Sequence, residues 1–166
     1  MGVQSRLLGY IKEAWPGLAA GGDPARMQHM LDSDSQISRH NEDVLGSLPT
    51  ADEWPPLCRP MFAWAPVDAP MIVYKNRLIH LAASLKEVDW ELREWLDKFE
   101  GLLRRLYWES AYIRFEAAYI GTHEFTWRPT DAWVKELCQG RLSPITEWSF
   151  TSTLPAEDLA RLHESG

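Results

Sequence analysis

The feature that most constrains the fold is a change in hydrophobic period between residues 89 and 127. After Asp89, a candidate helix cap, apolar side chains recur every three or four residues to about Tyr107, as on one face of an α-helix. Between 111 and 127 the period falls to two around Gly121, which is typical of a β-hairpin, although a helix through Tyr119 also fits the spacing. The helical stripe comprises Leu92, Trp95, Leu96, Phe99, Leu102, Leu103 and Leu106.

Flanking segments predict further elements. Within residues 3–15, Leu7, Leu8, Ile11 and Trp15 fall on one helical face. Other helices are expected at 23–31, at 38–45, between Thr130 and Gly140 and, as a short charged helix, after Pro155. The β-branched and aromatic residues of 145–153 predict a third strand.

Two segments are less regular. The apolar spacing of 70–87 favours a helix, but a hairpin turning at Lys75-Asn76 is the alternative. The 49–70 segment has six prolines, which exclude a long helix or a central strand, and it also contains Trp54 and Trp64. We interpret it as an extended segment packed across the core.

These elements predict one α+β domain over residues 1–166, with several helices packed on a small antiparallel sheet or hairpin. A mostly α-helical bundle is the alternative, because 70–87 and 108–120 can be helix or strand.

Charge and composition limit the function classes. The net charge of −7 disfavours nucleic-acid binding and suits a basic protein partner. The two cysteines, Cys58 and Cys138, make neither a disulfide framework nor a metal pair. No stretch of about 18 apolar residues is present, so we expect no membrane span and a cytoplasmic protein.

No residue pattern indicates catalysis. The five histidines lack the spacing of a helical zinc pair, and glycine-rich phosphate loops and a GxSxG nucleophile turn are missing. Cys58 beside Arg59 is only a weak candidate for a reactive thiol. We therefore expect neither a metal nor a cofactor, and no enzymatic activity.

Nine tryptophans are the compositional anomaly. Most of them, including Trp95, Trp127 and Trp133, are expected in the core. Trp90 lies one residue off the helical stripe, and Trp54 is either a lid on the core or an exposed anchor. Exposed aromatic and acidic side chains suit a protein interface, so the candidate partner-binding residues are Glu42, Asp43, Asp52, Glu53, Trp54 and Trp90.

The size, the acidity and the helix–hairpin–helix run LLRRLYWESAYIRFEAAYIGTHEFTWRPTDAWVKEL resemble, in general type, bacterial immunity proteins. Bacteria keep these proteins against their own polymorphic or contact-delivered toxins. The resemblance implies a non-enzymatic cytosolic protein, monomeric or homodimeric, that neutralises a cognate toxin or effector domain, and it assigns no individual residue.

Two other functions remain open. One is a small-molecule-binding protein or enzyme whose aromatic-lined pocket is formed by His80, Tyr112, Arg114, Glu116 and His123. The other is an adaptor or chaperone for a secreted effector.

Overall fold

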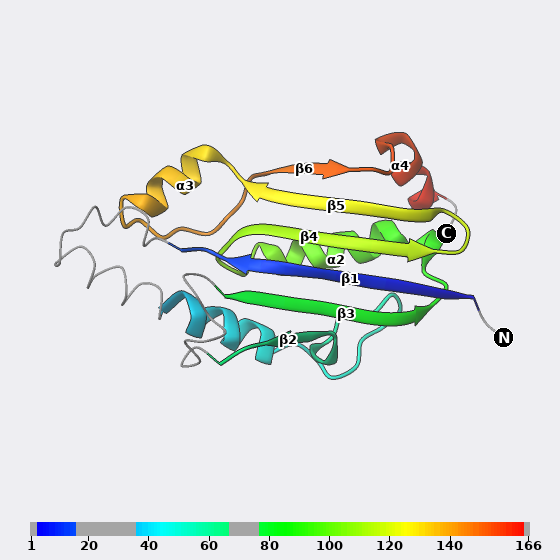
Figure 1. Ribbon diagram of the computed structural model, residues 1–166, viewed down its shortest axis with the longest axis horizontal. Helices are drawn as coiled ribbons and strands as arrows, with labels where there is room; N and C mark the ends of the chain where they lie inside the picture. Colours follow the sequence, from blue (N-terminus) through cyan, green and yellow to red (C-terminus); the bar gives the residue numbers. More distant parts are fainter. Residues whose placement is uncertain (1–2, 16–35, 67–76, 165–166) are drawn as a thin grey trace.

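The computed structural model describes residues 3–15, 36–66 and 77–164, and its centre is a six-stranded antiparallel sheet (Figure 1). The strand order is β2-β3-β1-β4-β5-β6. The α+β class is therefore as expected, but the sheet is larger than the small sheet or hairpin predicted. The strands are β1 (Gln4–Glu13), β2 (Phe62–Trp64), β3 (Leu78–Lys86), β4 (Trp108–Ala117), β5 (Gly121–Pro129) and β6 (Trp148–Ser152).

Helix α2 (Leu92–Leu103) packs on one face of this sheet, behind the strands in Figure 1. Its predicted stripe faces inward, and the ring centroids of Phe99 and Trp127 on β5 lie 5.0 Å apart. Trp95, Trp108 and Trp127 are fully buried. Truncating any one of these rings to alanine would cost about 3–5 kcal/mol. The face of the sheet that packs against α2 therefore holds the core.

The shorter helices lie around this core. α3 (Asp131–Cys138) and α4 (Ala156–Glu164) follow the last strands, and another helix covers residues 36–46. Thr130 caps α3 by accepting a hydrogen bond from the Trp133 amide, and Gly140 follows with a φ of 82°. The predictions of α3, of the β4–β5 hairpin and of a strand within 145–153 are confirmed.

The helix predicted for residues 3–15 is wrong, because this segment forms β1 in the middle of the sheet. Leu7 and Ile11 both point into the core. A separation of four residues places side chains on one side of a helix and also on one face of a strand, so these two positions satisfy both periods. Pairing with β3 and β4 selected the strand.

The helix favoured for 70–87 is also wrong over its described part, which is β3. Ile79 and Leu81 are buried while Leu78 and His80 are exposed, the alternation of a strand with one covered face. Of the two possibilities for 108–120, the strand is observed as far as Ala117. The first half of the 70–87 segment and the helix predicted at 23–31 lie outside the described residues.

Asp89 does not cap the helix as predicted. A short 3-10 turn, Asp89–Glu91, precedes α2, and the Asp89 carboxylate is buried. It accepts hydrogen bonds from the amides of Tyr119 and Ile120, each at 3.0 Å, in the turn between β4 and β5. Asp89 therefore links the start of α2 to the hairpin.

The proline-rich segment is described from 49 to 66. It includes a 3-10 turn (Arg59–Met61) and β2. Leu57 and Phe62 are buried, and the Trp95 indole donates a hydrogen bond to the Pro56 carbonyl at 2.9 Å. This part of the segment packs against α2 and the β3 edge of the sheet.

Candidate protein-binding surface

The second face of the sheet is open. In Figure 1 it is turned toward the reader, and none of the described helices lies on it. The outward residues of β1 are Arg6, Leu8, Tyr10 and Lys12, which alternate with the inward Ser5, Leu7, Gly9, Ile11 and Glu13. Such a face is usually polar where it meets water. Here Leu8 is 42% exposed, Tyr10 is 37% exposed and Leu78 on β3 is 41% exposed.

Two tyrosines form the centre of this face. Tyr10 pairs with Tyr112 on β4 and with His80 on β3, and the tyrosine rings stack with centroids 5.6 Å apart. The Tyr112 hydroxyl donates to the Glu124 carboxylate at 2.8 Å. Burial and this hydrogen bond raise the pKa of Tyr112, so the hydroxyl stays protonated. Tyr10 and Tyr112 therefore form a stacked aromatic pair in which the hydrogen bond to Glu124 orients the Tyr112 ring.

Charged side chains surround the tyrosines. Arg114 lies 3.0 Å from Glu116 and 3.7 Å from Glu124, and Lys12 lies 3.7 Å from Glu109. All these pairs are partly exposed, so they contribute little to stability. Their effect is to neutralise the charge next to the aromatic centre.

The predicted residues of the 52–54 loop are all exposed, and Asp52 also has a structural role. Asp52 accepts hydrogen bonds from the Leu57 amide at 2.9 Å and from Lys98 on α2 at 3.0 Å. These two contacts, the amide first, hold the pKa of Asp52 below its ordinary value. Glu53 is exposed and Trp54 is 47% exposed, so of the two positions considered for Trp54 the exposed one is observed.

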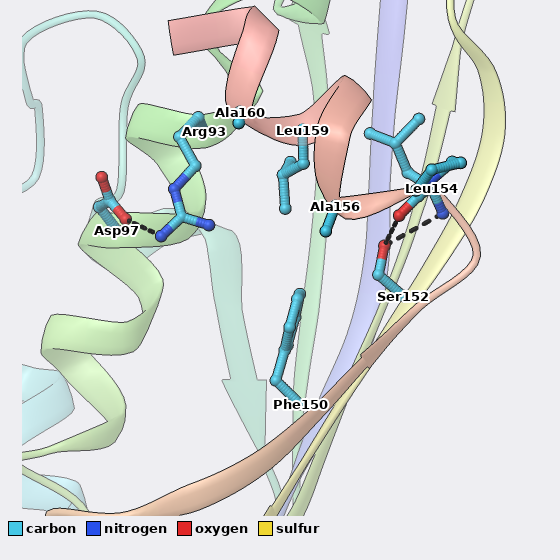
Figure 2. Close-up of a pocket in the computed structure, with 9 residues that line it drawn as sticks. Arg93, Asp97, Phe150, Ser152, Leu154, Ala156, Leu159 and Ala160 are labelled. Carbon is cyan, nitrogen blue, oxygen red and sulfur yellow. Dashed lines mark hydrogen bonds and ion pairs between the residues drawn. The ribbon is translucent and has the colours of Figure 1, made fainter.

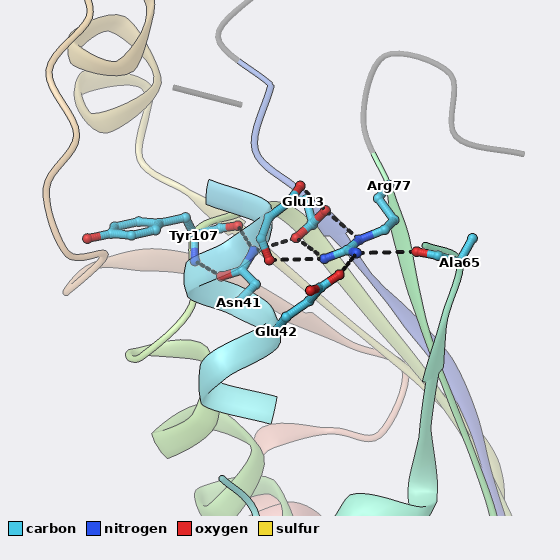
Figure 3. Close-up of polar contacts among 7 residues, drawn as sticks. Glu13, Asn41, Glu42, Ala65, Arg77 and Tyr107 are labelled. Atoms are coloured by element: carbon cyan, nitrogen blue, oxygen red, sulfur yellow. Dashed lines mark hydrogen bonds and ion pairs between the residues drawn. The ribbon is translucent and has the colours of Figure 1, made fainter. Parts of the chain in front are cut away.

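Glu42 belongs to a buried polar cluster, shown in Figure 3. Arg77 donates from Nε and Nη2 to the two oxygens of Glu13, at 2.8 and 3.0 Å, and from Nη1 to Glu42. Burial by itself lowers the pKa of Arg77, but Glu13 and then Glu42 outweigh it and raise that pKa. Asn41 donates to Glu13 at 2.8 Å and accepts from the Tyr107 amide.

This cluster joins segments that are distant in the chain. It connects the end of β1, the residues before β3 and β4, the 36–46 helix and the Ala65 carbonyl. Its polar groups satisfy one another, so it acts as a structural link rather than a binding site. Asp43, the neighbour of Glu42, is exposed on the same helix.

Trp90 lies in the 3-10 turn that precedes α2 and is 43% exposed. It stacks on Tyr119, in the β4–β5 turn, with ring centroids 6.3 Å apart. Tyr119 is itself 60% exposed. Trp90 and Tyr119 thus form a small second aromatic patch. The Asp89 carboxylate fixes the turn that carries Tyr119 by accepting hydrogen bonds from the Tyr119 and Ile120 amides.

The five polar residues expected to form an aromatic-lined pocket do not lie on one face of the sheet. His80, Tyr112, Arg114 and Glu116 belong to the open face, whereas His123 belongs to the opposite face and contacts the Ile120 carbonyl at 2.7 Å. Cys58 is half-buried, and burial followed by Asp52 raises the pKa of its thiol. A raised pKa disfavours the reactive thiolate.

A groove of about 700 Å³ lies elsewhere, between β6, α2 and α4 (Figure 2). The Phe150 ring points into it from β6, opposite Leu159 on α4. Arg93 and Asp97 on α2 form an ion pair of 3.0 Å along its wall. Sequence reasoning did not predict this groove, since its walls come from three elements that meet only in the folded chain.

The outward residues of β1 were also missed. The signal for them was the alternation of Arg6, Leu8, Tyr10 and Lys12, which a helical interpretation of 3–15 concealed. Comparison with family models, curated proteins and solved structures finds no match to this chain. Among the described residues, no helix is long and apolar enough to cross a membrane.

Proposed function

We propose that this protein is a non-enzymatic binding protein whose open sheet face holds another protein. The observation that carries the proposal is the exposed patch of Leu8, Tyr10 and Leu78 around the Tyr10–Tyr112 pair, on a face that no described helix covers. Tyrosine-centred apolar patches with a polar border are typical of protein interfaces.

The area of this face is sufficient for such an interface. Strands lie about 4.8 Å apart and rise about 3.3 Å per residue, so six strands of which four have nine or ten residues span roughly 24 by 30 Å. The resulting area of roughly 700 Å² is close to the 800 Å² or so that each partner buries in a standard complex.

The partner class that we propose is a toxin or effector domain, which the chain would neutralise in the cytosol as immunity proteins do. The support is the resemblance in size, acidity and helix–hairpin–helix order, together with the open face. Neutralisation needs a cognate pair, so the test is co-expression of this protein with the product of the adjacent gene. The measurements are rescue of growth and formation of a complex.

The variants for this test follow from the exposure values. Leu8→Ser with Tyr10→Ser removes apolar surface from the open face, and we expect rescue and binding to fall at least tenfold. Val134→Ser with Leu142→Ser, at residues that are each 38% exposed outside the sheet, is the matched control and should keep both. Equal behaviour of the two double variants, or a neighbour that is neither toxic nor bound, would reject the proposal.

Small-molecule binding is the second candidate, favoured by the groove beside β6. Its volume of about 700 Å³ lies within the usual 300–1,000 Å³ of small-molecule sites. A thermal-shift screen against metabolites tests it, with Ala160→Trp as the variant that fills the groove. A ligand that raises the unfolding temperature of the original protein and of the Ala160→Trp variant equally does not bind in the groove.

A further inference from the structure

The open face has the opposite charge to the rest of the protein. Five cations lie on it, and three carboxylates are present if Glu109 is counted, which leaves a net charge of +2. The whole chain carries −7, so the remaining residues sum to −9. The cations are Arg6, Lys12, Lys86, Arg114 and Arg128, and the carboxylates are Glu109, Glu116 and Glu124.

These charges are arranged around the apolar centre rather than across it. Arg114 and Lys12 are paired with carboxylates of the same face. Arg6, Lys86 and Arg128 form no ion pair with any residue that the structure describes. By register, Lys86 lies opposite Gln4 at one end of the strands, and Arg128 lies opposite Ser149 toward the other end. Arg6 lies opposite Glu116 on β4, toward the same end as Lys86, so these three cations flank the tyrosines at the two ends of the strands and form a rim.

An apolar centre within a charged rim is the anatomy of a protein–protein interface. Rim charges contribute mostly to the rate of association, because they attract a partner of opposite sign before the apolar surfaces meet. The sign here requires an acidic partner surface, whereas the net charge of the chain by itself suggested a basic one.

Nucleic acid fits this face less well. Duplex DNA carries one phosphate charge per about 1.7 Å of its axis, so a strand crossing the sheet would pass over Glu116 and Glu124. The remaining residues of the chain sum to a net charge of −9, which disfavours a polyanion. The Tyr112 hydroxyl, one of the polar groups at the centre, is already engaged by Glu124.

We propose that the open sheet face binds an acidic protein surface, with Tyr10 and Tyr112 in the apolar contact and Arg6, Lys86 and Arg128 at the attracting rim. This inference rests on the proposed function and specifies the chemistry of the partner. Arg6, Lys86 and Arg128 thereby become determinants of specificity and not of folding.

The defined probe for the experiment is the random copolymer poly(Glu,Tyr), which combines carboxylates with phenol rings. Its counterpart poly(Lys,Tyr) has the opposite charge, and a 20-nucleotide oligouridylate represents a single-stranded nucleic acid. Binding is followed at low salt by the backbone amide signals of the full chain in ¹H–¹⁵N spectra. We expect poly(Glu,Tyr) to shift the amides of β1, β3 and β4 and to bind at least tenfold more tightly than either other polymer.

The charge-reversed variant is Arg6→Glu with Lys86→Glu and Arg128→Glu. The matched control is Arg39→Glu with Lys135→Glu and Arg141→Glu, which changes the net charge equally at exposed positions outside the sheet. We expect the first triple variant to lose at least tenfold in affinity for poly(Glu,Tyr), and the control to lose no more than about threefold.

Equal losses in the two triple variants would overturn the inference, because bulk charge would then explain the binding. Preferred binding of poly(Lys,Tyr) or of oligouridylate at the same amides would overturn it as well. The inference can fail while the proposed function holds. If Leu8→Ser with Tyr10→Ser abolishes neutralisation while rim reversal leaves the rate of association with the partner unchanged, the face binds a protein but that protein is not acidic.

Discussion

At the scale of single residues, Arg77 is a charged side chain that is buried in the protein and paired with a buried carboxylate. Its side chain is 1% exposed, and it holds the Glu13 carboxylate, which is 2% exposed, in a two-point hydrogen-bonded contact. An isolated buried ion pair adds little net stability, since both charges lose their water. Removing one partner is costly, because the other charge then stays buried alone.

We therefore predict that Arg77→Met lowers the free energy of unfolding by about 3–5 kcal/mol, measured by urea denaturation. Glu42→Gln is the control, because Glu42 is 35% exposed and keeps access to water; it should cost less than about 1 kcal/mol. If Arg77→Met does not fold, the double variant Glu13→Gln with Arg77→Met should fold better, since it removes the unpaired charge. An Arg77→Met protein as stable as the original would contradict a buried ionic link.

Asp52 gives the stability a dependence on pH. Its folded pKa lies below the ordinary value of 3.8, because the Leu57 amide and then Lys98 stabilise the carboxylate. A lowered folded pKa means that the contribution is complete above the unfolded pKa and is lost as the pH falls through the folded one.

Asp52→Asn should accordingly lower the free energy of unfolding by about 1 kcal/mol near neutral pH. The difference from the original protein should shrink as the pH falls below 3.8, which urea titrations at several pH values measure. Glu53→Gln changes the neighbouring exposed carboxylate and should unfold as the original does. A constant difference at all pH values would assign the effect to shape rather than charge.

At the scale of elements, the contact of β1 with β4 depends on a glycine. A Cβ built on Gly9 would lie too close to the Tyr112 carbonyl oxygen and 2.8 Å from Ile113 Cδ1. The backbone oxygen cannot move without separating the two strands, and β1 lies between β3 and β4 at the centre of the sheet. A side chain at this position would therefore disturb three strands.

Gly9→Ala should lower the midpoint of thermal unfolding strongly, with a loss of more than about 2 kcal/mol by analogy with overpacked cores. Gly101→Ala is the matched substitution, because a Cβ at this position of α2 meets no atom within 4 Å. Alanine is the better helix former, so this variant should gain about 0.5–1 kcal/mol. If Gly9→Ala and Gly101→Ala both stabilised or both destabilised the protein, the result would contradict the close approach of β1 and β4.

At the scale of the whole molecule, the two faces of the sheet differ in their charge and in whether a helix packs on them. One face packs against α2 and holds the core, and the other carries the exposed aromatic pair and the cationic rim. The net charge of −7 averages over both. The copolymer and neutralisation experiments address this division directly, because each compares a residue of the open face with an equally exposed residue elsewhere.

The local pattern determined the elements whose period is unambiguous. The α2 stripe, the β4–β5 hairpin and the capped α3 were all predicted, because each depends on contacts within a few residues of the chain. The burial of Trp95, Trp127 and Trp133 followed from the same patterns.

Tertiary pairing decided what the local pattern left open. Leu7 and Ile11 in β1 lie four residues apart, as do Leu81 and Leu85 in β3, and this spacing fits a helix and a strand alike. Only the pairing of β1 with β3 and with β4, about 70 to 110 residues away in the chain, selected the strand. Because the open face exists only once these strands are adjacent, its aromatic centre and its rim could not be located from the order of the residues.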